Sequence, residues 1–187
     1  MLGILKGFLP WILYSILYGP SPAQFRLALI VAIACSLFLD RAELKKGFLL
    51  TWCTLIYFLG LLVYTSLHEA IWLKQHMWLI SNLALACIAL GSAAIQKPFT
   101  MQYAKEKTEP QYWNTPLFIE INYILTLLWG VIFIFSAFTN YLHISHWHLN
   151  GTTYFILNNI GWVIGAYLSK VFPEYWKKYR GNKQNNK

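Results

Sequence analysis

The sequence predicts an all-α fold, a polytopic transmembrane helical bundle, and two observations support this. Of its 187 residues, 57% are hydrophobic and only 12% are charged, whereas a soluble domain carries roughly 25% charged residues. So few water-facing groups do not suffice to cover a soluble globule. The second observation is the length of the apolar segments, because a hydrocarbon core of about 30 Å takes about 20 helical residues to cross.

Six apolar segments come close to that length, and we expect five or six of them to span the membrane. They are residues 2–19, 23–39, 48–67, 77–96, 117–142 and 153–172. Lys6 and Pro10 interrupt the first segment, which is expected either to span or to re-enter. Together the segments predict one domain over residues 1–172. A basic tail, 173–187, follows and is expected to be disordered from residue 181.

The distribution of Lys and Arg predicts the topology. Thirteen of the fifteen fall on one side of the predicted membrane, and only Arg26 and Lys74 fall on the other. Positive residues are retained on the cytoplasmic side, so we expect loops 20–22, 68–76 and 143–152 outside and the C-terminus in the cytoplasm. The net charge of +8 thus reflects topology and attraction to anionic lipids, and nucleic acid is not an expected partner.

Several short motifs occur in a recognisable order. They are Phe8-Leu9-Pro10 in the first segment, DRAELKK at 40–46, Lys97-Pro98 after the fourth segment, and Trp129-x-Val131-x-Phe133-Ile134 with Asn140 in the fifth. In this order and spacing the chain resembles the bacterial intracellular septation protein A family, small inner-membrane proteins of unknown biochemical activity. The resemblance implies a role in cell-envelope maintenance or division through contacts with other inner-membrane proteins. It supplies no catalytic residues.

The segment KPFTMQYAKEKTEPQYWNTP, residues 97–116, is longer and more aromatic than its counterpart in that family. Proline usually ends a helix or stands in its first turn, so Pro98 and Pro110 bound a helix over 99–109. Phe99 and Tyr103 stand four residues apart on one face of it. We expect an amphipathic helix on the cytoplasmic membrane surface, anchored also by Trp113. A docking surface or a gate is the alternative, with Lys97 beside it.

Small residues recur at helical spacing in two segments. Gly161 and Gly165 form a GxxxG motif that Ser169 extends, and a second stripe comprises Ala84, Cys87, Gly91 and Ala94. Such faces let another helix backbone approach closely, either within the chain or in a partner or a second copy of the chain. The residues predicted to form interfaces come from three places. They are Lys97, Phe99, Tyr103 and Trp113 in the loop, Trp129 and Asn140 in the fifth segment, and Gly161 and Gly165 in the sixth.

A small-solute or lipid transporter is the second hypothesis. Ionisable and amide side chains inside a membrane often mark a transport pathway, because lipid penalises them. The candidates for such a pathway are Glu120, Asn82, Asn122 and Asn158. A hydrogen bond to a neighbouring helix is the simpler use for each.

The histidines provide the third hypothesis, a metal or pH site on the outer face. HISHWH places His143, His146 and His148 within six residues, with His68 and His76 in another predicted outer loop. Imidazole is the commonest metal ligand, but this spacing matches no strict signature. No nucleophile elbow, HExxH or phosphate-binding glycine loop is found, so the sequence predicts a non-enzymatic protein without a cofactor.

Overall fold

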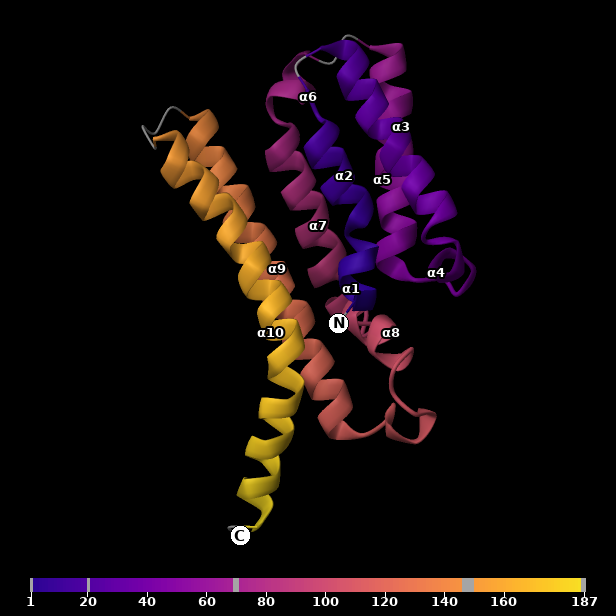
Figure 1. Ribbon diagram of the computed structural model, residues 1–187, viewed down its shortest axis with the longest axis vertical. Helices are drawn as coiled ribbons and strands as arrows, with labels where there is room; N and C mark the ends of the chain where they lie inside the picture. Colours follow the sequence, from indigo (N-terminus) through magenta and orange to yellow (C-terminus); the bar gives the residue numbers. More distant parts are fainter. Residues whose placement is uncertain (1, 20, 69–70, 146–149, 186–187) are drawn as a thin grey trace. The chain divides into compact units, whose positions relative to one another are not determined.

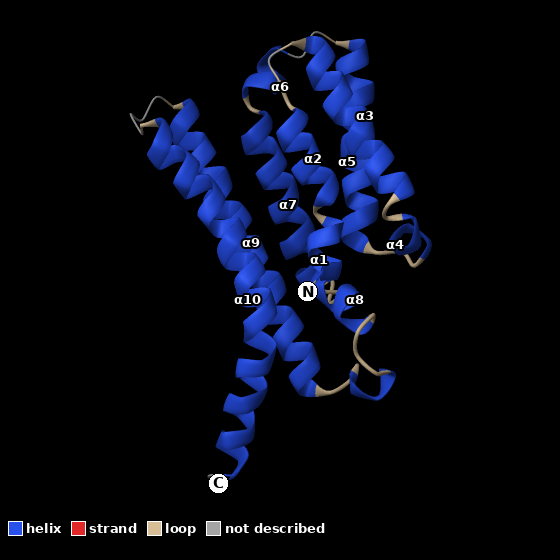
Figure 2. Cartoon of the chain, in the orientation of Figure 1, coloured by secondary structure: helices blue, strands red, loops and turns tan. Residues whose placement is uncertain are grey.

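The computed structural model describes residues 2–19, 21–68, 71–145 and 150–185, and the regular structure within these ranges is entirely helical (Figures 1 and 2). The all-α prediction is therefore confirmed. The chain divides into two compact units, Leu2–Met77 and a second unit that begins at Trp78. The single domain expected over residues 1–172 stays a prediction. Each unit is described separately below.

In the part of the chain that the structure describes, four helices are long and apolar enough to cross a membrane. They are α5 (Leu49–Leu67), α7 (Met77–Ala94), α9 (Pro116–Ile144) and the Gly151–Asn182 part of α10 (Gly151–Asn185). The second predicted segment forms α3 (Pro22–Phe38), an apolar helix of 17 residues. The first forms two short helices, α1 (Leu2–Gly7) and α2 (Leu9–Leu17), because Pro10 starts a new helix. Among the described residues the structure therefore shows four candidate spans, and the expected five or six are not confirmed.

In the first unit α3 contacts both α2 and α5. Phe25, Ala28, Leu29 and Ala32 recur at three- and four-residue steps, so they share one face of α3, and all four are buried. The indole of Trp11 on α2 donates a 2.8 Å hydrogen bond to the hydroxyl of Thr54 on α5. The short helices α4 (Arg41–Lys45) and α6 (Ile71–Gln75) stand at the two ends of α5 (Figure 1).

In the second unit α9 and α10 form a long antiparallel hairpin (Figure 1). The α7–α9 connection holds α8 (Phe99–Lys105) and the 3₁₀ helix η1 (Pro110–Tyr112), and α8 packs against α9. Helix α10 contains Pro173 and continues as far as Asn185. The basic tail is thus helical over residues 181–185, where composition suggested disorder.

Two helices end in the same type of turn with different residues at its critical position. After α4, Gly47 has φ of 74°, and the amide of Phe48 donates to the carbonyl of Glu43 at 3.0 Å. After α7, Gln96 has φ of 59°, and the amide of Lys97 donates to the carbonyl of Ser92 at 2.8 Å. Both are Schellman turns, which require a left-handed residue that is usually glycine. The turn at Gln96 directs the chain from α7 into α8.

Candidate functional site

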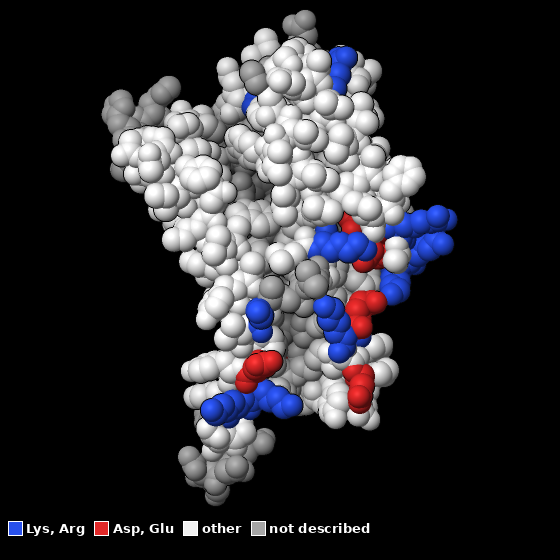
Figure 3. Space-filling view, in the orientation of Figure 1, with Lys and Arg blue, Asp and Glu red and all other residues white. Residues whose placement is uncertain are grey.

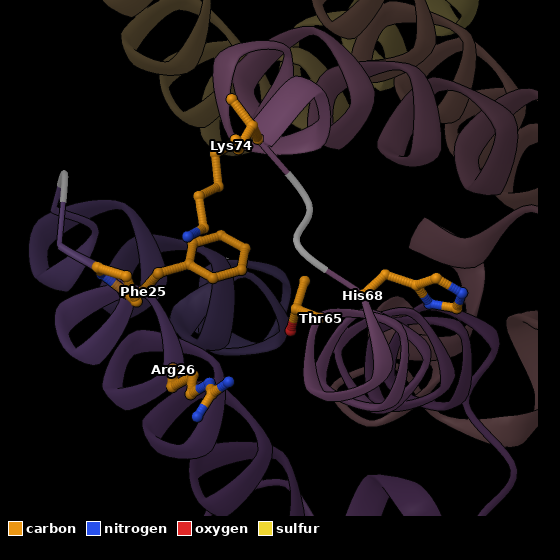
Figure 4. A pocket seen from close by; sticks show the side chains of 7 residues that line it. Phe25, Arg26, Thr65, His68 and Lys74 are labelled. Atoms are coloured by element: carbon orange, nitrogen blue, oxygen red, sulfur yellow. The ribbon is translucent and has the colours of Figure 1, made fainter.

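The candidate site is a cavity of about 350 Å³ in the first unit, at the end of α5 that α6 follows. Its volume lies within the roughly 300–1,000 Å³ typical of small-molecule pockets. Side chains from α3, α5, α6 and the residue after α5 surround it (Figure 4). The lining residues are Pro22, Phe25, Arg26, Thr65, His68, Ile71 and Lys74.

Local capping positions the α3 side of the cavity. Ser21 caps α3: its hydroxyl accepts from the amide of Gln24, and the Gln24 side chain accepts from the amide of Ser21. The helix therefore starts at Pro22, which places the next residues in its first turns. Phe25 is 1% exposed, whereas Arg26, the next residue, is exposed.

A hydrogen bond from Tyr18 fixes the α6 side of the cavity. The hydroxyl of Tyr18, just after α2, donates a 2.7 Å hydrogen bond to the carbonyl of Lys74 on α6. The ammonium of Lys74 then lies 5.8 Å from the ring centroid of Phe25, within the range of a cation–π contact. Lys74 and Arg26 thus lie on the same side of the cavity as Phe25 (Figure 4).

Thr65 and His68 contribute less to binding chemistry. The hydroxyl of Thr65 already donates to the carbonyl of Leu61 at 2.7 Å, so its only proton is in use. The imidazole of His68 stacks on Tyr64 at 4.9 Å between ring centroids and points away from Arg26 and Lys74 (Figure 4). Nδ1 of His68 lies 3.3 Å from the carbonyl of Tyr64, and a neutral imidazole that donates there keeps only an acceptor nitrogen. With that tautomer, the side-chain donors left for a ligand are the guanidinium of Arg26 and the ammonium of Lys74.

The cavity is positively charged. No carboxylate is among its lining residues, and within the described ranges neither Arg26 nor Lys74 forms an ion pair. In the first unit most charged side chains lie near α4, at the other end (Figure 3). Glu69, next to His68 in sequence, lies outside the described residues. An anion bound in the cavity would be stabilised by the positive charges of Arg26 and Lys74.

The structure places the predicted loop residues differently from the expectation. Helix α8 ends at Lys105, and Phe99 and Tyr103 are 1% and 4% exposed, so their aromatic face is buried rather than laid on a membrane surface. Trp113 donates from its indole to the carbonyl of Thr108, and Lys105 lies 5.3 Å from its ring centroid. Lys97 is exposed.

Polar contacts hold α8 between α7 and α9. The amide of Phe99 donates to the hydroxyl of Ser92 at 3.0 Å. The hydroxyl of Thr100 donates to the carbonyl of Asn122 at 2.8 Å and lies 2.8 Å from the hydroxyl of Thr126. Because Thr100 has one proton, Thr126 is the donor of the second bond. Nothing in the loop pattern indicated this buried network.

The other predicted interface residues lie between α9 and α10. A Cβ at Gly165 would come within 2.9 Å of Trp129, and one at Gly161 within 2.8 Å of Ile132. The indole of Trp129 donates to the hydroxyl of Ser169 at 3.1 Å. Asn140 donates to Asn158 at 2.9 Å and accepts from Tyr154 at 2.7 Å, measured between side-chain atoms. The GxxxG face therefore serves the hairpin of this chain.

The predicted transport residues do not converge on one another. Asn82 and Asn122 each donate to the carbonyl four residues earlier on their own helix, at 2.8 Å. Asn158 is bonded to Asn140, as described above. Glu120 accepts a two-pronged interaction from Arg180, with an oxygen–nitrogen distance of 2.6 Å. Within the described chain no hydrogen bond joins any two of the four.

The histidines give no metal cluster within the described residues. His143 stacks on Tyr154 with ring centroids 4.2 Å apart. His146 and His148 lie outside the described residues. His76 stacks on Trp72, as His68 does on Tyr64.

Sequence reasoning missed a buried acid before α4. Asp40 is 1% exposed, and neither carboxylate oxygen has a hydrogen-bond partner in the described structure. Burial raises the pKa of Asp40 to about 6, Lys6 opposes the rise and Glu43 adds to it. Lys6 donates to Glu43 at 2.8 Å. Only the position of DRAELKK directly after an apolar segment hinted that this acid is buried.

No protein family, characterised protein or solved structure matches the chain, so the case for its function rests on its own residues and geometry.

Proposed function

We propose that this chain is a multi-pass protein of the bacterial inner membrane that acts in envelope maintenance or division through contacts with other membrane proteins, without catalysing a reaction. In this proposal the C-terminus is cytoplasmic. Four apolar helices of spanning length support the membrane assignment. The resemblance to the septation protein A family and the distribution of basic residues support the rest.

The observation that carries the proposal is the small-residue stripe on α7. Cys87 is exposed, and no described atom lies within 4 Å of a Cβ built at Gly91. The buried face of α7 instead carries Leu85, Ala86 and Ala89. Within the second unit the stripe is thus left open, whereas the glycine face of α10 is filled by α9. An open thin face on an apolar helix suits close approach by another helix.

Cys87 allows a direct test in native membranes. With Cys35 and Cys53 replaced by Ser, a bifunctional maleimide links Cys87 to whatever cysteine lies beside it. We expect a crosslinked product that is absent from the Cys87→Ser chain. A product of twice the 21.8 kDa of one chain indicates a second copy, and another mass indicates a different protein. If linkers of several lengths give no product that depends on Cys87, the proposal is contradicted.

Bulk on the stripe tests whether the contact matters. Gly91→Leu is expected to abolish the crosslink and to fail to restore envelope integrity, measured as survival of osmotic shock and as cell length in a deletion strain. Gly60→Leu on α5 is the matched control, because a Cβ at Gly60 is equally open. Equal loss of function in both variants, at equal protein levels, would count against a specific α7 contact.

No specific observation favours the transport alternative, since its residues bond to separate partners.

A further inference from the structure

We infer that the cavity at the α3–α5–α6 end of the first unit binds a phosphate group carried on an organic molecule. The inference goes beyond the proposed function and does not depend on it. Its starting point is the convergence of Arg26 and Lys74, which stand 48 positions apart yet line one cavity, with no carboxylate among the lining residues that the structure describes.

The donor chemistry favours phosphate. Arg26 offers a planar fork that binds two oxygens at once, and Lys74 offers a compact charge with rotatable donors. The hydroxyl of Thr65 already donates its hydrogen bond to the carbonyl of Leu61. The two remaining side-chain donors, Arg26 and Lys74, are both cationic. A ligand with several oxygens and at least one full negative charge satisfies both together, and a neutral hydrogen-bonding solute would leave the cations uncompensated.

The remaining walls favour an organic substituent. Phe25, Pro22 and Ile71 supply an apolar surface next to the cations. The cavity also lies at the end of α5, which is a candidate span. The end of a membrane-spanning helix lies at the depth of the lipid headgroups. A phosphate ester therefore fits better than inorganic phosphate. Its source is either a phospholipid headgroup or a soluble ester, and the chemistry is shared.

Binding is measured on the full chain in a neutral detergent. Calorimetry with inorganic phosphate and with glycerol phosphate tests the soluble source. Native mass spectrometry with phosphatidylglycerol or phosphatidylcholine tests the lipid source. We expect phosphatidylglycerol or glycerol phosphate to bind more tightly than inorganic phosphate. Displacement of the lipid by glycerol phosphate identifies one shared site, and retention of lipid alone identifies the headgroup as the ligand.

The variants separate this site from general charge. Arg26→Gln and Lys74→Gln are each expected to weaken binding about tenfold, since each removes a charge-assisted contact. Lys74→Arg keeps the charge and retains binding, which guards against misfolding as the cause. Arg41→Gln removes an exposed cation on α4 and changes nothing. Failure of all probes to bind, or an equal loss with Arg41→Gln, overturns the inference.

Discussion

Thr100 on α8 and Thr126 on α9, 26 positions apart, share a buried hydrogen bond of 2.8 Å between their hydroxyl oxygens. The hydroxyl of Thr100 donates its own hydrogen bond to the carbonyl of Asn122. The loop segment is thereby fixed to the candidate span that follows it, and Ser92 ties it to the span that precedes it.

Thr100→Val is expected to destabilise the protein by about 1–3 kcal/mol, because it leaves the hydroxyl of Thr126 buried without its acceptor. The volume of the side chain is nearly unchanged, so packing is not the cause. Thermal unfolding of the purified protein in detergent measures the effect. Thr152→Val, at an exposed position of α10, is the control and should leave the unfolding temperature unchanged. Equal behaviour of the two variants would show that the network contributes no stability.

Gly165→Ala is expected to cost about 1–3 kcal/mol by overpacking the α9–α10 hairpin. Its Cβ would lie 2.9 Å from the ring of Trp129, and a buried indole has little room to move. Gly60→Ala adds the same methyl group where nothing lies within 4 Å, so it should be neutral or stabilise by up to about 1 kcal/mol. Unfolding temperatures of the two variants provide the comparison. A stabilising Gly165→Ala would mean that the hairpin is packed less tightly than described.

Asp40 is expected to make stability depend on pH. Its folded pKa of about 6 lies above the ordinary value of 3.8, so the folded protein holds this proton more tightly than the unfolded chain. The contribution of Asp40 to stability is therefore most favourable below pH about 4 and is lost as the pH rises through about 6. Asp40→Asn removes the titration, so it should raise the unfolding temperature at pH about 8 and lose that advantage below pH about 4. Glu109→Gln, an exposed acid, should show no such difference. A pH-independent effect of Asp40→Asn would refute this explanation.

The two Schellman turns predict opposite results from exchanging their residues. Gln96→Gly relieves a left-handed conformation that costs a side chain roughly 1 kcal/mol, partly offset by the greater freedom of glycine in the unfolded chain. A gain of up to about 1 kcal/mol is expected. Gly47→Gln should lose a similar amount, since it creates the same strain after α4. Unfolding temperatures measure both, and two changes of the same sign would be inconsistent with this account.

Residue periodicity predicted the helices well and their surroundings poorly. The spacing of Phe99 and Tyr103 correctly indicated a helix after Pro98, although it ends four residues earlier than expected. An apolar helical face is buried in lipid or in protein by the same physical force, so the pattern alone does not distinguish them. The hydrogen bonds of Thr100 to α9 show that this face of α8 packs against protein. A single threonine gives no periodic signal, so the sequence pattern did not reveal this contact.

The sequence likewise predicted only part of the candidate cavity. Counting charges by loop singled out Arg26 and Lys74 as the only cations on their side of the predicted topology. Their convergence depends on the hydrogen bond from Tyr18 to the carbonyl of Lys74, a contact between residues 56 positions apart. Helical periodicity describes neighbours within about one turn, so it contains no information about such a pairing.

The seating of α8 has a mechanical consequence. A flexible connection would let two neighbouring helices slide along each other, by up to a whole turn of about 5.4 Å. Here the connection is bonded to Ser92 on one helix and to Asn122 and Thr126 on the other. Axial displacement of α7 against α9 would break those bonds together. The segment between the two helices thus acts as a rigid spacer that sets their register, and a force on either helix is transmitted to the other.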